Sequence, residues 1–170
     1  MGIFSAFYPK EYVDSTYNID FETMYAEGVR GLIFDIDNTL VPHGAAADSR
    51  AVELFNRLRS IGFYTVLLSN NRKERVEPFA DAVGSGYIFK AGKPSVKGYE
   101  KAMSLMNTDR DSTCFIGDQL FTDVWGANRT GIRTILVRPI NPKEEFQIVL
   151  KRILERIVLF FYNRRRKNND

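Results

Sequence analysis

The sequence predicts an α/β fold in which a parallel β-sheet lies between two layers of helices, a three-layer doubly wound sandwich. From residue 30 onward, short apolar runs alternate with longer segments whose apolar residues recur at helical spacing. No internal repeat and no long linker divides the chain. The length of 170 residues and the 44% hydrophobic content are typical of one globular domain, which we assign to residues 1–170.

The predicted strands and helices alternate regularly. The strands are short apolar runs closed by polar residues, expected at 31–34, 64–68, 86–89, 113–116 and 133–137. The helices carry apolar residues three and four positions apart, at 51–61, 73–82, 96–106 and 120–129. Such alternation produces right-handed crossovers and therefore a parallel sheet. Residues 1–28 have weak periodicity, and we expect them to pack against the main body irregularly or as short helices.

The C-terminal segment, residues 143–170, combines an amphipathic helix expected at 143–162 with a basic tail. Basic residues outnumber acidic ones eight to three between Lys143 and Lys167, although the net charge of the chain is only +3. This helix either covers the sheet or lies on an anionic membrane, and both alternatives stay open. The basic run at 164–167 has no interleaved aromatic residues and no nucleic-acid motif, so nucleic acid is not an expected partner.

Polar side chains follow the first four predicted strands, at the point where each strand ends. They are Asp35, Asp37, Ser69, Asn70, Lys93, Asp118 and Asp123. Ligands of doubly wound sheets bind at the carboxyl ends of the strands, so we expect these side chains to converge. Carboxylates suit Mg²⁺, and a metal and a lysine together neutralise a phosphate group. The pattern predicts phosphoryl transfer with Mg²⁺ as cofactor.

Each of these residue types suits a step of phosphate-ester hydrolysis. The carboxylate of Asp35 can attack phosphorus and form an aspartyl-phosphate, which water then hydrolyses. Asp37 can protonate the leaving alcohol and afterwards deprotonate the water. Ser69 and the Asn70 amide can hold phosphate oxygens. A cap of the following helix is nearly as good a role for Ser69, and the two roles can coexist. His43, the only histidine, follows the first of these positions; it could touch a leaving group, but a residue of a flap or of the surface is the more common role at such a place.

Four motifs occur in a fixed order: Asp35-Ile36-Asp37-Asn38-Thr39-Leu40, Ser69-Asn70-Asn71, Lys93-Pro94, and Gly117-Asp118 through Asp123. Over residues 30–138 they resemble the motifs of the haloacid dehalogenase (HAD) superfamily. The residues of these motifs are similar to those of the bacterial YqeG family of subclass IIIA, which itself resembles mitochondrial phosphatidylglycerophosphate phosphatases. The resemblance implies a phosphatase with a HAD-like Rossmannoid sheet.

The resemblance also implies a role for each matching residue. Asp35 would be the nucleophile and Asp37 the general acid and base. Mg²⁺ would bind the Asp35 carboxylate, the backbone carbonyl of Asp37 and the Asp118 carboxylate. Thr39 and Asp123 would support these ligands from nearby.

Phosphate would be bound by Ser69, Asn70 and Lys93. Phosphatidylglycerophosphate is the substrate suggested by the family resemblance, and phosphoproteins, sugar phosphates and nucleotides are the alternatives. Cys114 is the only cysteine, which excludes a disulfide within the chain and indicates a reducing, cytoplasmic compartment. A lipid substrate and the basic helix at 143–167 would together place the protein at the inner face of the membrane.

The spacing of the motifs excludes a cap domain. Asp35 and Ser69 are 34 positions apart and Ser69 and Lys93 are 24 apart, enough for one loop and one helix each. Two non-enzymatic alternatives must be weighed. A binding or regulatory protein that recognises phosphate would not need Asp37, and a phosphorylation-receiver domain would carry its aspartate after the third strand, whereas Asp35 follows the first.

Overall fold

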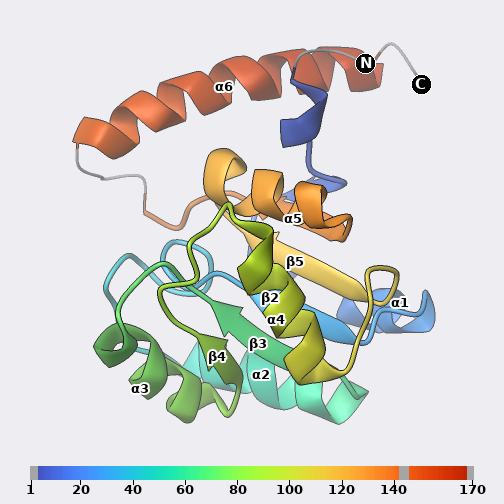
Figure 1. The fold of residues 1–170 in the computed structure, drawn as a ribbon, viewed down its shortest axis with the longest axis vertical. Helices are drawn as coiled ribbons and strands as arrows, with labels where there is room; N and C mark the ends of the chain where they lie inside the picture. Colours follow the sequence, from blue (N-terminus) through green and yellow to red (C-terminus); the bar gives the residue numbers. More distant parts are fainter. Residues whose placement is uncertain (1–3, 142–145, 168–170) are drawn as a thin grey trace.

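The computed structural model describes residues 4–141 and 146–167 and contains one six-stranded sheet (Figure 1). The strands are β1 Glu11–Val13, β2 Gly31–Phe34, β3 Tyr64–Leu68, β4 Gly86–Ile88, β5 Thr113–Gly117 and β6 Arg133–Val137. They run parallel in the order β1-β6-β5-β2-β3-β4. The chain passes from β2 outward to β4 and then returns to β5, on the other side of β2. The predicted doubly wound fold is confirmed.

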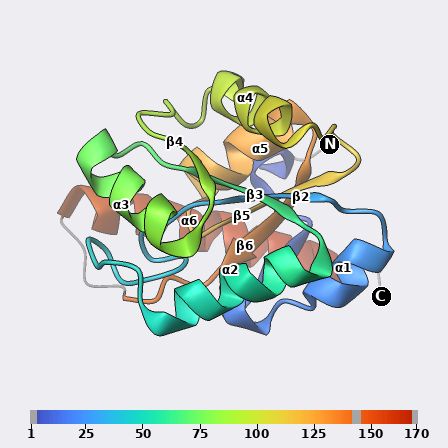
Figure 2. The same ribbon diagram turned by 90° about the horizontal axis from the view of Figure 1, so that it is seen from below.

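Helices cover both faces of the sheet (Figure 2). They are α1 Phe21–Ala26, α2 Ser49–Ile61, α3 Lys73–Val83, α4 Val96–Met106, α5 Trp125–Thr130 and α6 Phe146–Lys167. Helices α4 and α5 lie on one face, where Ile33 and Phe115 pack with Tyr99. Helices α1, α2 and α3 lie on the other, where Phe34 packs with Phe55. Neighbouring strand residues point to opposite faces, so the runs in β2 and β5 fill both halves of the core.

The connections between strands confirm the absence of a cap. Between β2 and β3 the chain forms one loop and α2, and between β3 and β4 only a short turn and α3. Both connections lie within the described part of the chain. Neither connection contains a separate domain that could cover the carboxyl edge of the sheet.

The prediction for residues 1–28 missed a strand. Besides α1 and two 3₁₀ turns, this segment contains β1, which pairs with β6 at the edge of the sheet. β1 is three half-buried residues long and begins with Glu11, whose carboxylate pairs with Arg133. Such a short, partly charged strand at the edge of the sheet pairs with only one neighbouring strand and is only half buried. Its sequence therefore contains no apolar run that would predict a strand.

The last helix, α6, extends to Lys167, beyond the predicted end at 162, and residues 143–145 lie outside the described residues. It crosses one end of the molecule above α5 and the N-terminal turn (Figure 1). One side of α6 packs on the body, where Val158 joins Leu120, Val124 and Leu136. Over the described residues, no helix combines the length and apolar character needed to cross a membrane.

Candidate active site

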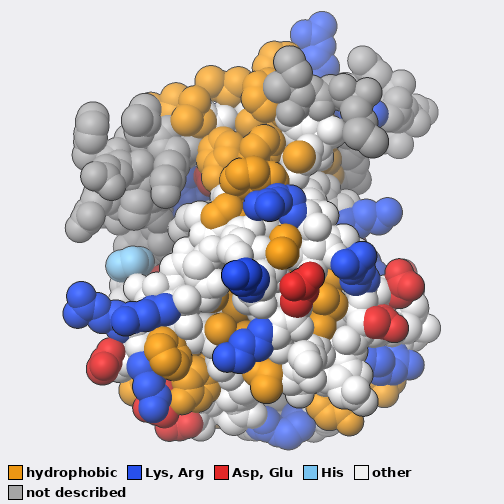
Figure 3. All heavy atoms as spheres, viewed as in Figure 1, with side chains coloured by type: hydrophobic (Ala, Val, Ile, Leu, Met, Phe, Trp, Pro, Cys, Tyr) orange, Lys and Arg blue, Asp and Glu red, His pale blue; other side chains and the backbone are white. Residues whose placement is uncertain are grey.

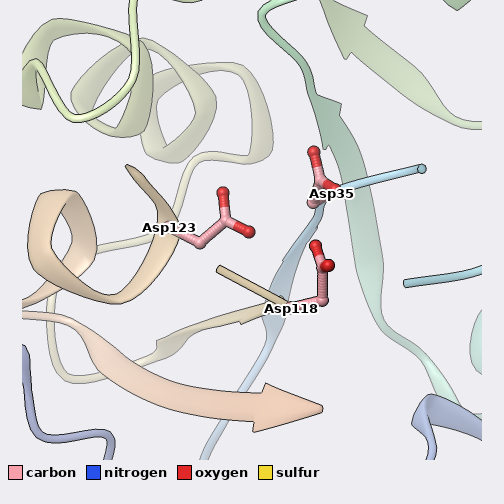
Figure 4. Close-up of side chains that lie close together, drawn as sticks. All are labelled: Asp35, Asp118 and Asp123. Carbon is pink, nitrogen blue, oxygen red and sulfur yellow. The ribbon is translucent and has the colours of Figure 1, made fainter. Parts of the chain in front are cut away.

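Three buried carboxylates meet where the strand order reverses. Asp35 directly follows β2 and Asp118 directly follows β5, and these two strands are hydrogen-bonded neighbours. Asp123 reaches the same point from η3 (Leu120–Val124), a π-helical turn that precedes α5. Oxygen atoms of the three side chains lie within 4.8 Å of one another (Figure 4). The predicted convergence of Asp35, Asp118 and Asp123 therefore holds.

Lys93 bridges two of the three carboxylates. Its Nζ lies 2.7 Å from Asp35 Oδ1 and 2.7 Å from Asp123 Oδ1, and its side chain is only 4% exposed. Burial alone would lower the pKa of Lys93, but the Asp123 and Asp35 carboxylates raise it above its usual value. Asn70 fixes the backbone here, because its Oδ1 accepts from Lys93 N at 2.8 Å and its Nδ2 donates to Lys93 O at 3.1 Å.

Asp118 is held by a residue that the sequence analysis did not select, Arg152 of α6. Arg152 Nη2 donates to Asp118 Oδ2 at 2.6 Å, and Nη1 donates to the Asp118 carbonyl at 2.9 Å and to Glu155 Oε2 at 3.0 Å. Glu155 is buried as well and accepts from Leu120 N at 3.0 Å. The spacing of Arg152 and Glu155 predicts a helical pair, but no pattern in the sequence indicates that the pair meets a residue 34 positions away.

The acidic cluster fits a divalent cation. One oxygen of each carboxylate accepts from a basic side chain: Asp35 Oδ1 from Lys93 Nζ and Asp118 Oδ2 from Arg152 Nη2. The other oxygens, Asp35 Oδ2 and Asp118 Oδ1, each lie 3.4 Å from Thr39 Oγ1. Burial raises the pKa of Asp35 to about 6 against the opposing effect of Lys93. Burial and the neighbouring carboxylates also raise the pKa of Asp118. The negative charge of the three carboxylates exceeds the positive charge of the neighbouring basic side chains. Carboxylate oxygens with such an excess of negative charge suit a cation such as Mg²⁺.

Asp123 has a different environment from the other two carboxylates. Its Oδ1 faces Lys93, and its Oδ2 accepts from Gln119 N at 3.1 Å. Both oxygens are therefore already engaged by protein donors. This arrangement suits a residue that orients Lys93 better than one that coordinates a metal.

The carboxylate of Asp37 is bound by donors other than those that hold the acidic cluster. Its Oδ1 accepts from Gly44 N at 2.8 Å and from Arg75 Nη2 at 2.8 Å, and its Oδ2 accepts from Asn71 Nδ2 at 2.7 Å. Arg75 lies in the first turn of α3 and was not selected from the sequence, because a single arginine on an amphipathic helix gives no signal. Asp37 still faces the cavity that Asp35 enters.

That cavity, of about 240 Å³, contains the remaining predicted site residues. It is lined by Asp35, Asp37, Asn38, His43, Ser69, Asn70, Asn71, Lys93, Gln119 and Thr122. Ser69 is buried, and its Oγ accepts from Asn71 N at 3.1 Å. The alternative role of Ser69 as a helix cap is wrong, since α3 begins only at Lys73. His43 is exposed and also lines this cavity.

Gly117 is required by close packing against Asp123. A Cβ atom at this position would lie 2.4 Å from Asp123 Oδ2 and 2.7 Å from Phe115 Cε1. We expect Gly117→Ala to push Asp123 away from Lys93 and to lower the free energy of unfolding by about 1–3 kcal/mol. Thermal unfolding and phosphatase assays on the purified variant would check this. Unchanged stability with full activity would show that Asp123 can move without consequence.

Comparison with known proteins defines the class of the protein. Residues 90–139 match the HAD-hydrolase-like family model, which agrees with the parallel sheet and with the acidic site at its carboxyl edge. The probable phosphatase YqeG of Bacillus subtilis is 37% identical over 154 residues, which cover 90% of each chain. The chain therefore belongs to the YqeG family of HAD phosphatases.

A more distant relative and a solved structure are also similar to this chain. The chloroplastic phosphatidylglycerophosphate phosphatase 1 of Chlamydomonas reinhardtii is 28% identical over 149 residues, which cover 81% of this chain and 55% of the relative. The cobalt-bound deoxy-D-mannose-octulosonate 8-phosphate phosphatase YrbI of Haemophilus influenzae superposes with a TM-score of 0.53 at 14% identity. That match covers 65% of this chain and 69% of the other and shows a shared fold.

Proposed function

We propose that this phosphatase is an Mg²⁺-dependent phosphomonoester hydrolase that works through an aspartyl-phosphate on Asp35. The observation that carries the proposal is the burial of Asp35 beside Lys93 and Asp118 at the reversal of the strand order. Mg²⁺ would be held by Asp35, the Asp37 carbonyl and Asp118, and it would neutralise the negative charge of the phosphate. We treat residues 1–170 as the single domain that performs this chemistry.

The reaction divides into two steps. First, a carboxylate oxygen of Asp35 bonds to phosphorus, and the bond between phosphorus and the leaving oxygen breaks. Asp37, in its protonated form, donates its proton to the leaving oxygen. Second, water attacks the phosphorus while Asp37 takes a proton from it, and the bond between phosphorus and Asp35 breaks. Inorganic phosphate is released and both aspartates return to their first state. Ser69, Asn70 and Lys93 hold the phosphate oxygens during both steps.

Mg²⁺ should raise the melting temperature of the protein in the absence of any substrate. The cation would relieve the repulsion between Asp35 and Asp118, and a ligand at a hundred times its dissociation constant stabilises by about 2.7 kcal/mol. We expect Asp118→Asn to reduce this increase sharply, whereas Asp111→Asn, at an exposed aspartate outside the site, should retain it. Equal Mg²⁺-induced shifts in both variants would show that the cation binds elsewhere.

The proposed substrate is phosphatidylglycerophosphate. Its support is the similarity to phosphatidylglycerophosphate phosphatases and the absence of a cap in the described connections, which leaves room for a large substrate. A lipid substrate and the lone Cys114, which suits a reducing compartment, are consistent with a cytoplasmic protein at the inner face of the membrane. Peripheral membrane contact through residues 143–167 accompanies this proposal.

A comparison of substrates under one condition tests the assignment. Phosphate release would be measured with Mg²⁺ on phosphatidylglycerophosphate in mixed micelles, a sugar phosphate, a nucleotide and a phosphopeptide. We expect the largest kcat/KM for the lipid. A larger value for one of the soluble substrates would overturn the lipid assignment and leave the phosphatase mechanism intact.

A further inference from the structure

Helix α6 carries large apolar side chains that the body of the protein leaves about half exposed. Five large hydrophobic side chains on it, Ile153, Leu154, Ile157, Phe160 and Phe161, are between 45% and 61% exposed. Glu155, which is buried against the body, projects from nearly the opposite side of the helix to Ile157 and Phe160. Val158 lies one turn from Leu154, and Phe161 stacks on Phe4 with ring centroids 6.0 Å apart, so these positions form the border between the packed side and the exposed side. Hydrophobic side chains gather over α6 along the upper edge of Figure 3. We call the five exposed residues the outer face of α6.

The charge around the outer face has one sign. Arg164 continues the line of Ile153, Ile157 and Phe160 at helical spacing, and Arg156 and Arg165 border it on either side. All three arginines are exposed. Glu155 is the only acidic residue of the sequence between Phe146 and Lys167, and it is buried against Leu120 and Arg152. The outer face therefore offers apolar side chains and positive charge without compensating acids.

We infer that the outer face of α6 docks on an anionic lipid bilayer. Apolar side chains would enter the boundary between head groups and acyl chains, and arginines would reach the anionic head groups. The choice of a bilayer as partner rests on the proposed phospholipid substrate and deepens it. A second copy of this chain fits less well, because a twofold contact would bring the same arginines together with no acids opposite.

The same helix reaches into the active site. Arg152, on the inner side of α6, holds both the carboxylate and the carbonyl of Asp118. Docking through the outer face would therefore place a lipid surface on the element that positions a proposed metal ligand. For this reason deletion of the helix is a poor test, since it removes membrane contact and Asp118 support together.

Point substitutions on the outer face separate the two roles. Co-sedimentation of the full chain would be measured in EDTA with vesicles of phosphatidylserine and phosphatidylcholine, and with vesicles of phosphatidylcholine alone. Phosphatidylserine is anionic and is not a phosphomonoester, so it reports on the surface and not on the catalytic cavity. We expect binding to the anionic vesicles that weakens as salt is raised.

The double variant Ile157→Asp/Phe160→Asp should bind these vesicles at least about tenfold more weakly, because aspartate cannot bury apolar surface in the bilayer as isoleucine and phenylalanine would. Leu105→Asp, at a 58% exposed leucine on α4, is the matched control and should bind like wild type. Replacing Arg156, Arg164 and Arg165 by Gln should weaken binding about fivefold for each charge. The same change at Lys97, Lys101 and Arg110, exposed residues outside α6, should have little effect.

Two outcomes would overturn the inference. One is equal vesicle binding by wild type and the Ile157→Asp/Phe160→Asp variant. The other is a protein dimer in sedimentation velocity that the variant dissociates, with vesicle binding unchanged. Hydrolysis of a water-soluble phosphomonoester by the same variant should stay at the wild-type rate, so failure of docking is distinguishable from failure of the proposed phosphatase chemistry.

Discussion

Asp35→Asn should abolish phosphate release, lowering kcat by about three orders of magnitude or more, because no other group replaces a covalent nucleophile. Asparagine keeps the size of the side chain and an oxygen that can accept from Lys93 Nζ, which lies 2.7 Å from Asp35 Oδ1. The loss should therefore appear in activity and not in folding. Steady-state assays on wild type and variant with Mg²⁺ would measure it.

The melting temperature in EDTA is the control for this variant. Burial raises the pKa of Asp35 to about 6, so above that pH its charged form weakens folding, and this cost is absent in the amide. We expect Asp35→Asn to melt at the same temperature as wild type or higher. Retained phosphatase activity in a well-folded variant would exclude Asp35 as the nucleophile.

Lys93→Met should cost both activity and stability. The Nζ group lies between Asp35 and Asp123, and all three residues are buried. Removing one partner of a buried ion pair typically costs about 3–5 kcal/mol, because the remaining carboxylates lose their counter-ion. Urea unfolding would measure the loss of stability, and phosphate release should fall to the background because a phosphate-binding group is gone.

A second substitution separates these two effects. In Lys93→Met/Asp123→Asn one unpaired carboxylate is removed, so much of the lost stability should return while activity stays absent. Lys97→Met, at an exposed lysine on α4, should change neither quantity. If the double variant recovered activity as well, Lys93 would serve only to balance the charge of Asp123.

Much of the fold was predictable because the sequence of each central strand agrees with its place in the fold. Gly31–Phe34 and Thr113–Gly117 are buried along their whole length, so their apolar runs identify them as central strands. The acids that end these runs fall at the carboxyl edge by topology alone. This is why Asp35 and Asp118 could be paired although they are far apart in the sequence.

The parts that were missed depend on contacts between distant segments. β1 is defined only by its pairing with β6, and its short sequence carries no alternation of its own. The contact of Arg152 with Asp118 depends on how α6 settles on the body, which amphipathic spacing does not determine. The same spacing predicted an apolar face on α6, but not that large apolar residues such as Ile157 and Phe160 would remain exposed.

The most direct test of the account is chemical capture of phosphorylated Asp35. During turnover of a phosphomonoester with Mg²⁺, borohydride reduces an aspartyl-phosphate to homoserine, and peptide mass spectrometry locates the change. We predict homoserine at position 35, dependent on both substrate and Mg²⁺ and absent from Asp35→Asn. Phosphate release without homoserine at position 35, or with homoserine at another aspartate, would contradict the proposed mechanism.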